Sequence, residues 1–148
     1  MSHQDWMRMA LEQAKIAYDL GEVPIGAVVI QDNKVIALAH NEKEQRQDPT
    51  AHAEVLAVQR ATEKLGTWRL SDATLYVTLE PCPMCAGALV QSRLRTLVFG
   101  ASDLKGGAVG SVMNVLDFSR WNHRVEVVAG ILEEDCSAIL KNFFRQRR

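Results

Sequence analysis

The chain has 148 residues and a mass of 16.5 kDa, which is the size of one domain. Hydrophobic residues make up 47% and charged residues 24%, so a wholly disordered chain is excluded. The net charge of −1 argues against a protein that coats DNA with its whole surface. No apolar run approaches the ~20 residues of a membrane span. The first residues lack the basic stretch and apolar core of a secretory signal.

The charge is unevenly distributed along the chain. No acidic residue occurs from Cys136 to the end, whereas Lys141, Arg145, Arg147 and Arg148 lie there. We therefore expect a local basic patch in spite of the balanced total.

The three cysteines are Cys82, Cys85 and Cys136. An odd number without a secretion signal argues against a disulfide framework and favours a reducing, cytoplasmic location. The spacing C-x-x-C in Cys82-Pro-Met-Cys85 is typical of metal or redox chemistry in such a compartment.

The first half of the chain is predicted to begin with a helix and a hairpin. In order, the expected elements are a helix from Trp6 to Tyr18, strands over 25–30 and 35–39 joined by a turn, and a polar loop over 41–50. Asp5 is the expected N-cap of the helix and Gly21 its stop.

The second half is predicted to alternate helices and strands. The expected elements are a helix over 52–65, a strand over 74–78, a helix over 83–92, strands over 97–100 and 124–128, and a helix over 133–147. Thr50 is the expected cap of the first of these helices, and Gly106, Gly107 and Gly110 mark a turning loop. With no linker or repeat, residues 1–148 read as one α/β domain, a sandwich with a mixed sheet covered on both faces.

Two short segments carry residues suited to chemistry, and each opens a predicted helix. They are His52-Ala53-Glu54 and Pro81-Cys82-Pro83-Met84-Cys85. Cysteines at i and i+3 of a helical turn point to the same side, so both sulfurs can reach one ion. The helix N-terminus also favours the thiolate form that binds metal. One imidazole and two thiolates suit zinc, so His52, Cys82 and Cys85 are the predicted ligands.

The number of ligands indicates a catalytic rather than a structural metal. A structural zinc has four protein ligands, whereas a catalytic zinc has three and a position for water, whose pKa it lowers toward neutrality. Glu54 lies two residues from His52 and is not needed as a ligand. It can accept the proton of the water and return protons to the substrate's ring nitrogen and leaving amine. This is the chemistry of hydrolytic deamination.

Other interpretations of the same residues stay open at this point. A closed structural site would take its fourth ligand from His3, His40, His123 or Cys136. Cys136 is better explained as a small buried residue of the last helix. A thioredoxin-type redox pair would leave the His52-Ala-Glu54 segment without a role.

Together these residues resemble the H-x-E…P-C-x-x-C pattern of zinc nucleobase deaminases. Within that superfamily the chain resembles the bacterial tRNA-specific adenosine deaminases over nearly its whole length. The matching segments are residues 22–28, 48–54, 75–88, 122–125 and 143–147. Segments 48–54 and 80–85 are also similar to guanine deaminases, whereas Asn122-His-Arg124 and Phe143-Phe-Arg145 point to the tRNA enzymes.

The resemblance implies a cytidine-deaminase-like three-layer α/β/α sandwich around a five-stranded mixed sheet. It also implies one zinc ion per subunit, a homodimer, and conversion of adenosine to inosine at the wobble position of an arginine tRNA, in an RNA site with residues from both subunits. Asn41 corresponds to the family residue that holds the purine edge. The other residues implied to bind substrate are Ile25, Ala53, Asp103, Phe143, Arg145 and Arg147. Some relatives have a longer C-terminal tail, and its RNA contacts are not expected here.

Several of these residues also have a structural explanation. Asp103-Leu-Lys105 resembles a loop beside the RNA, but a charged loop tip is often only solvated. Phe143 and Phe144 can stack on the anticodon loop, or one of them can belong to the core. The arginines can pair with RNA or balance the helix dipole. His123 can contact phosphate or be a structural histidine.

Two other functions compete with the leading one. A free-purine deaminase, such as a guanine deaminase, would use the same zinc and the same glutamate. It would be insensitive to neutralisation of Arg145 and Arg147. A non-catalytic RNA-binding module stabilised by zinc would keep its function after Glu54→Ala, whereas a hydrolase would lose turnover.

Overall fold

A five-stranded mixed sheet forms the centre of the computed structural model, which describes residues 1–147 and thus leaves Arg148 of the expected basic patch outside the described residues. Its strands are β1 (Gly26–Gln31), β2 (Lys34–His40), β3 (Thr74–Leu79), β4 (Thr96–Ala101) and β5 (Glu126–Ala129). Their order across the sheet is β2-β1-β3-β4-β5. β1 is antiparallel to both of its neighbours, and β3, β4 and β5 are parallel.

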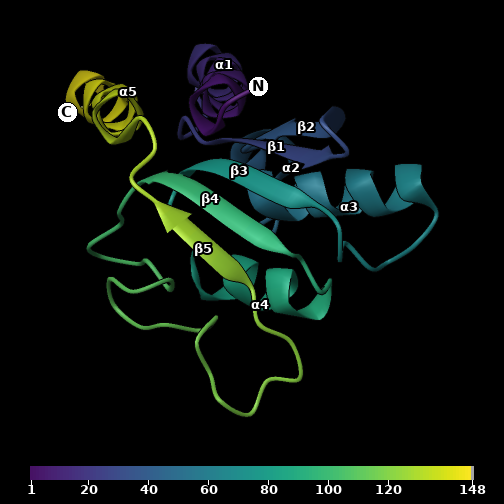
Figure 1. Cartoon of the computed structure of the whole chain (residues 1–148). Coiled ribbons are helices and arrows are strands. Elements are labelled where there is room, and N and C mark those ends of the chain that lie inside the picture. The colour runs from purple at the N-terminus through teal and green to yellow at the C-terminus, as the bar shows by residue number, and fades with distance from the viewer. Residues whose placement is uncertain (148) are drawn as a thin grey trace.

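Helices cover both faces of this sheet (Figure 1). They are α1 (His3–Asp19), α2 (Lys43–Arg46), α3 (Ala53–Leu65), α4 (Pro83–Gln91) and α5 (Glu133–Gln146). α1 and α5 lie side by side on one face, and α3 and α4 lie on the other (Figure 1). The expected three-layer α/β/α sandwich is therefore confirmed. Among residues 1–147, no helix combines the length and the apolar character needed to cross a membrane.

The sheet separates two hydrophobic clusters because successive strand residues point to opposite faces. Tyr76 and Val98 pack toward α1 and α5, in a cluster that includes Met7 of α1. Leu75 and Val77 pack in the other cluster, which contains the buried residues of α3 and α4. A strand that is buried on both faces reads as a continuous apolar run, as β1 and β4 do.

The hairpin between β1 and β2 turns at Asp32 and Asn33. Both residues have positive φ, 54° and 59°, as a two-residue hairpin turn with right-handed strand twist requires. This confirms the predicted hairpin.

The caps of two helices differ from the expected ones. Ser2 is the N-cap of α1, and Asp5 is the N3 residue of its capping box. The Asp5 N–H donates to the Ser2 hydroxyl at 3.2 Å, and the Ser2 N–H donates to the Asp5 carboxylate at 2.9 Å. His52 is the N-cap of α3, and the Thr50 hydroxyl donates to Asp48 rather than capping the helix. The expected caps were therefore wrong: Asp5 lies three residues after the observed N-cap of α1, and Thr50 lies two residues before that of α3.

The polar stretch over 41–50 contains the one-turn helix α2, which the composition did not predict. A residue outside α2 binds the backbone of this helix. The buried Glu22 carboxylate accepts the N–H groups of Glu44 and Gln45 at 3.0 and 2.7 Å. A helix this short is not stable without such a tertiary partner.

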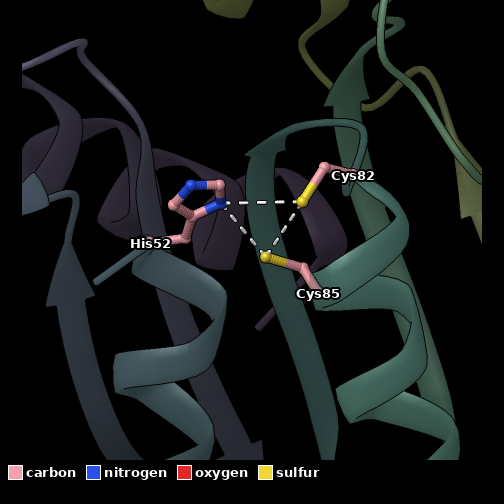
Figure 2. Close-up of side chains that lie close together, drawn as sticks. All are labelled: His52, Cys82 and Cys85. Carbon is pink, nitrogen blue, oxygen red and sulfur yellow. Dashed lines mark hydrogen bonds between the residues drawn. The ribbon is translucent and has the colours of Figure 1, made fainter. Parts of the chain in front are cut away.

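One end of the sheet brings together the segments suited to chemistry. β3 and β4 are parallel, so their carboxyl ends meet at the same edge. α4 follows β3 directly, and its first turn lies at this edge. α3 packs beside α4 and begins there as well (Figure 2).

Candidate metal and active site

Three side chains from two helix starts meet at this edge of the sheet (Figure 2). The Sγ atom of Cys82 lies 3.6 Å from Nδ1 of His52 and 3.6 Å from Sγ of Cys85. The third distance, from Cys85 Sγ to His52 Nδ1, is 3.4 Å. His52 and Cys82 are the N-caps of α3 and α4, and neither side chain caps its own helix. Both side chains are therefore free to point at a common ligand.

The triangle formed by these atoms fits a tetrahedral zinc ion. Usual zinc bond lengths place two tetrahedral sulfurs about 3.8 Å apart and a sulfur and a nitrogen about 3.6 Å apart. The observed separations of 3.6, 3.6 and 3.4 Å agree with this within about 0.2 Å. His52, Cys82 and Cys85 are thus positioned to bind a metal. Among the described residues, no fourth histidine, cysteine or carboxylate joins the group.

The pKa values of the two thiols move in opposite directions. A hydrogen bond from Cys85, with help from His52, lowers the pKa of Cys82 to about 4, although burial acts against it. The same hydrogen bond, burial and nearby Glu54 raise the pKa of Cys85. The two thiols therefore do not ionise together easily, because a thiolate on one sulfur opposes a thiolate on the other. A bound cation removes this conflict, because it stabilises both thiolates at once.

Glu54 is a buried carboxyl group beside these ligands. The residue is 4% exposed, and its Oε1 atom has no hydrogen-bond partner among the described residues. Burial raises the pKa of Glu54 to about 7, against the effects of a backbone N–H bond and of His52. A buried polar oxygen without a partner is rare in folded proteins and is expected where a substrate or water binds.

Comparison with known proteins agrees with this geometry. The family model of the MafB19-like deaminases matches residues 1–148. The tRNA-specific adenosine deaminase of Bacillus subtilis (strain 168) is 55% identical over 143 residues, which are 97% of this chain and 89% of that protein. The chain belongs to the tRNA-specific adenosine deaminase family.

Solved structures point to the same family of zinc deaminases. A structure from studies of A-to-I editing by tRNA:A34 deaminases at the wobble position is 44% identical, with a TM-score of 0.89. The match covers 92% of this chain and 99% of that one. The guanine deaminase of Bacillus subtilis is more distant, with 38% identity, a TM-score of 0.66, and coverage of 69% of this chain and 66% of that one.

A groove of about 910 Å³ lies at the same edge of the sheet as the metal-binding group. It is lined by Val23, Ile25, Leu79, Ser102, Asp103, Leu104, Lys105, Leu140, Phe144 and Arg147. Leu79 is the last residue of β3, three positions before Cys82. The groove therefore lies between this end of the sheet and α5, and its lining residues include neither Glu54 nor the metal-binding group.

The structure places the predicted substrate residues in different surroundings. Ile25 and Asp103 line the groove. Asn41 and Ala53 are buried near the start of α3, with exposed fractions of 5% and 0%. The Asn41 amide donates to the Val23 carbonyl at 3.3 Å, and its oxygen accepts the Lys43 N–H at 3.2 Å.

The aromatic residues of α5 divide between core and groove. Phe143 is 3% exposed and packs edge-on against Tyr18. The Arg147 guanidinium covers its ring at 3.6 Å. Phe143 thus has no open face for a base, which corrects its expected role as a stacking residue. Phe144 is 51% exposed and lines the groove, whereas Arg145 lines a separate depression on α5.

The Asn122-His-Arg124 segment makes hydrogen bonds within the protein. His123 Nε2 lies 2.6 Å from the Leu94 carbonyl oxygen, so the ring donates to the loop before β4. The Arg124 guanidinium donates to Asp117. The structure therefore supports the structural explanation of His123.

Two buried carboxylates at this edge were not found from the sequence. Glu22 holds α2, and Glu80 accepts hydrogen bonds from the loop after β4. The N–H groups that donate to these two carboxylates are far away in the chain, so the local periodicity of the sequence does not indicate that the carboxylates are buried. The position of Glu80 directly before the Pro-Cys pair was the available clue.

Proposed function

We propose that this chain hydrolyses adenosine to inosine at the wobble position of tRNA, with an arginine tRNA as the substrate. The observation that carries the proposal is the unpartnered, buried Oε1 of Glu54 beside a three-ligand metal group, in a chain 55% identical to a tRNA-specific adenosine deaminase. An open coordination position and a free proton acceptor are what hydrolytic deamination needs.

His52, Cys82 and Cys85 would hold one zinc ion per subunit. Zinc in such a set supplies Lewis-acid activation of water. Glu54 accepts the proton of the attacking water and delivers protons to the purine ring nitrogen and to the amino group that leaves as ammonia. Its raised pKa supports this role, because a group that titrates near neutrality can both accept and donate a proton.

Substrate recognition is assigned to residues beside the metal-binding group and to the groove at the same edge of the sheet. Asn41 holds the purine edge, and Ile25 and Ala53 form apolar walls around the base. The groove combines two cationic side chains, Lys105 and Arg147, with the exposed apolar side chains of Leu104 and Phe144. Cations suit the phosphate backbone, and exposed rings suit splayed bases of a single-stranded loop.

A tRNA substrate also implies where the protein works and how it assembles. Residues 1–148 act as a single zinc-dependent deaminase domain, and the protein works in the cytoplasm, where tRNA is modified. We also propose a homodimer in which both subunits contribute to the RNA site. Arg145, which lies outside the main groove, contacts the RNA from the neighbouring depression on α5.

A guanine deaminase is the second candidate, because a guanine deaminase structure is 38% identical to this chain. The groove argues against it: a free base needs no second surface that combines cationic and exposed apolar side chains. A paired assay separates the two. The zinc-loaded protein is given an arginine-tRNA anticodon stem-loop, free guanine and free adenosine, and the products are identified by mass spectrometry.

Inosine at the wobble position, with inert free purines, is the expected result. Turnover of guanine with an untouched stem-loop would overturn the substrate and the RNA contacts. RNA binding without turnover of any of the three would favour the non-catalytic module.

A further inference from the structure

Glu80 is a buried carboxylate whose four hydrogen bonds all come from one loop. It is 2% exposed and lies between the end of β3 and the first metal-binding cysteine. Its Oε1 accepts the Asp103 N–H at 3.0 Å and the Ser111 hydroxyl. Its Oε2 accepts the N–H groups of Val109 and Ser111 at 2.9 and 3.1 Å. We call residues 102–111, from which these donors come, the groove loop.

Within the described residues, no cationic side chain forms an ion pair with this carboxylate. The ion pairs found within residues 1–147 involve Asp5, Glu42 and Asp117, and none involves Glu80. A buried carboxylate without hydrogen bonds is very costly, so the bonds from the groove loop satisfy a strong requirement. The conformation of the loop and the burial of Glu80 therefore depend on each other.

The groove loop approaches the segment of Glu80 more closely than a side chain would allow. A Cβ added at Gly107 would lie 2.3 Å from the Glu80 carboxyl carbon and 2.6 Å from the Asp103 carbonyl oxygen. The Ala108 N–H donates to the Pro81 carbonyl at 2.9 Å, directly beside Cys82. The loop is thus fastened to the strand end that leads into the metal-binding group.

The same loop forms one wall of the groove. Asp103, Leu104 and Lys105 line it, and Leu104 is 83% exposed. The Asp103 side chain folds back onto its own loop, where its Oδ1 accepts the N–H groups of Lys105 and Gly106 at 3.1 Å each. The Asp103 N–H donates to Glu80, so Glu80 fixes the start of this turn.

We propose that Glu80 is a positioning residue for the RNA substrate: its carboxylate holds the groove loop so that residues 103–105 form a fixed wall beside the deaminase site. This rests on the proposed function. Without the carboxylate, the loop samples other conformations, and RNA must first select the competent one. If the competent conformation falls to a tenth of the population, the apparent affinity falls about tenfold.

Glu80→Gln tests the proposal, because an amide places an NH₂ group against two of the donors and removes the charge. The KM for the anticodon stem-loop is expected to rise about tenfold, with kcat at saturating RNA and zinc content close to those of the unchanged protein. The thermal midpoint is expected to fall by a few degrees, because two donors of the groove loop lose their acceptor. The amides of Asp103, Val109 and Ser111 are expected to exchange hydrogen faster. Glu126→Gln, which changes an exposed carboxylate on β5, is the matched control and leaves KM unchanged.

Gly107→Ala gives an independent test that leaves the carboxylate in place. The added methyl group displaces the loop from Glu80, so the same rise in KM is expected. If Glu80→Gln fails to fold, this variant carries the test alone.

Two results would overturn the proposal: an unchanged KM in folded Glu80→Gln or Gly107→Ala, or a loss of zinc and kcat with KM unchanged, which would assign Glu80 to the metal site. A wild-type protein that forms no inosine on the stem-loop is a different result. It would refute the proposed function itself, and the role of Glu80 in RNA binding with it.

Discussion

His52 Nδ1 and Cys85 Sγ lie 3.4 Å apart, although 33 positions separate the two residues in the chain. The contact exists because α3 and α4 pack side by side and begin at the same edge of the sheet. Each helix contributes its first residues, where side chains are not committed to helix packing. The metal-binding group is therefore a product of the sheet topology, and it is only as rigid as the two helix starts.

After removal of the metal, one of the three cysteines is expected to react with an alkylating reagent before the other two. Cys82 is partly exposed, whereas Cys85 and Cys136 have exposed fractions of 0%. After treatment with a chelator, a thiol-alkylating reagent should modify Cys82 first, and zinc should protect it. Mass spectrometry of peptides after timed alkylation measures the order. Equal rates for all three cysteines in the folded, chelated protein would contradict the burial that we describe.

Replacement of Glu54 by Gln is expected to abolish proton transfer and to keep the site intact. The amide has the same shape but cannot accept the proton of water, so kcat should fall by about a hundredfold to ten-thousandfold. Zinc content and stem-loop affinity should stay close to the unchanged values, because Glu54 is outside the three-residue metal group. Turnover within a few-fold of the original would exclude Glu54 as the proton acceptor.

The site was predicted from the sequence more completely than its surroundings. His52, Glu54, Cys82 and Cys85 lie in two short segments, and residue type and spacing define their chemistry. The sheet and its helices followed from apolar runs and turns, such as the hairpin at Asp32. These signals come from residues that are close together in the chain, so one sequence is enough to recognise them.

What the sequence did not reveal depends on contacts between distant segments. Glu22 and Glu80 are charged residues near strand ends, and their burial is visible only when the segments that donate to them are in place. The division of Phe143 and Phe144 between core and groove is decided by the packing of α5 on Tyr18. An adjacent pair of identical residues gives no way to tell which one faces inward.

Loss of the α1 capping box is expected to lower stability by a measurable amount. Ser2→Ala removes the hydroxyl that accepts the Asp5 N–H, which costs about 1 kcal/mol and about 3 °C in Tm. Asp5→Ala breaks the same pair, so the double variant should lose less than the sum of the single losses. Thermal unfolding of the four proteins measures this coupling. Strictly additive losses would show that the two caps act independently.

Arg147 and Arg145 are expected to differ in their effect on RNA binding. Arg147 lines the groove, whereas Arg145 lies in a separate depression on α5. If Arg147 neutralises one phosphate of the anticodon loop, Arg147→Gln should reduce the slope of log affinity against log salt by about 0.7. Arg145→Gln should weaken binding less, because its contact lies outside the main groove.

The measurement for these two variants is stem-loop affinity at several salt concentrations, with thermal unfolding as a check, since Arg147 also covers the Phe143 ring. A free base would not reach either arginine, so any turnover of guanine should be the same in both variants. Equal salt slopes for Arg147→Gln and the unchanged protein would place the phosphate backbone elsewhere on the surface. A larger effect at Arg145 would move the RNA path from the groove to the adjoining face of α5.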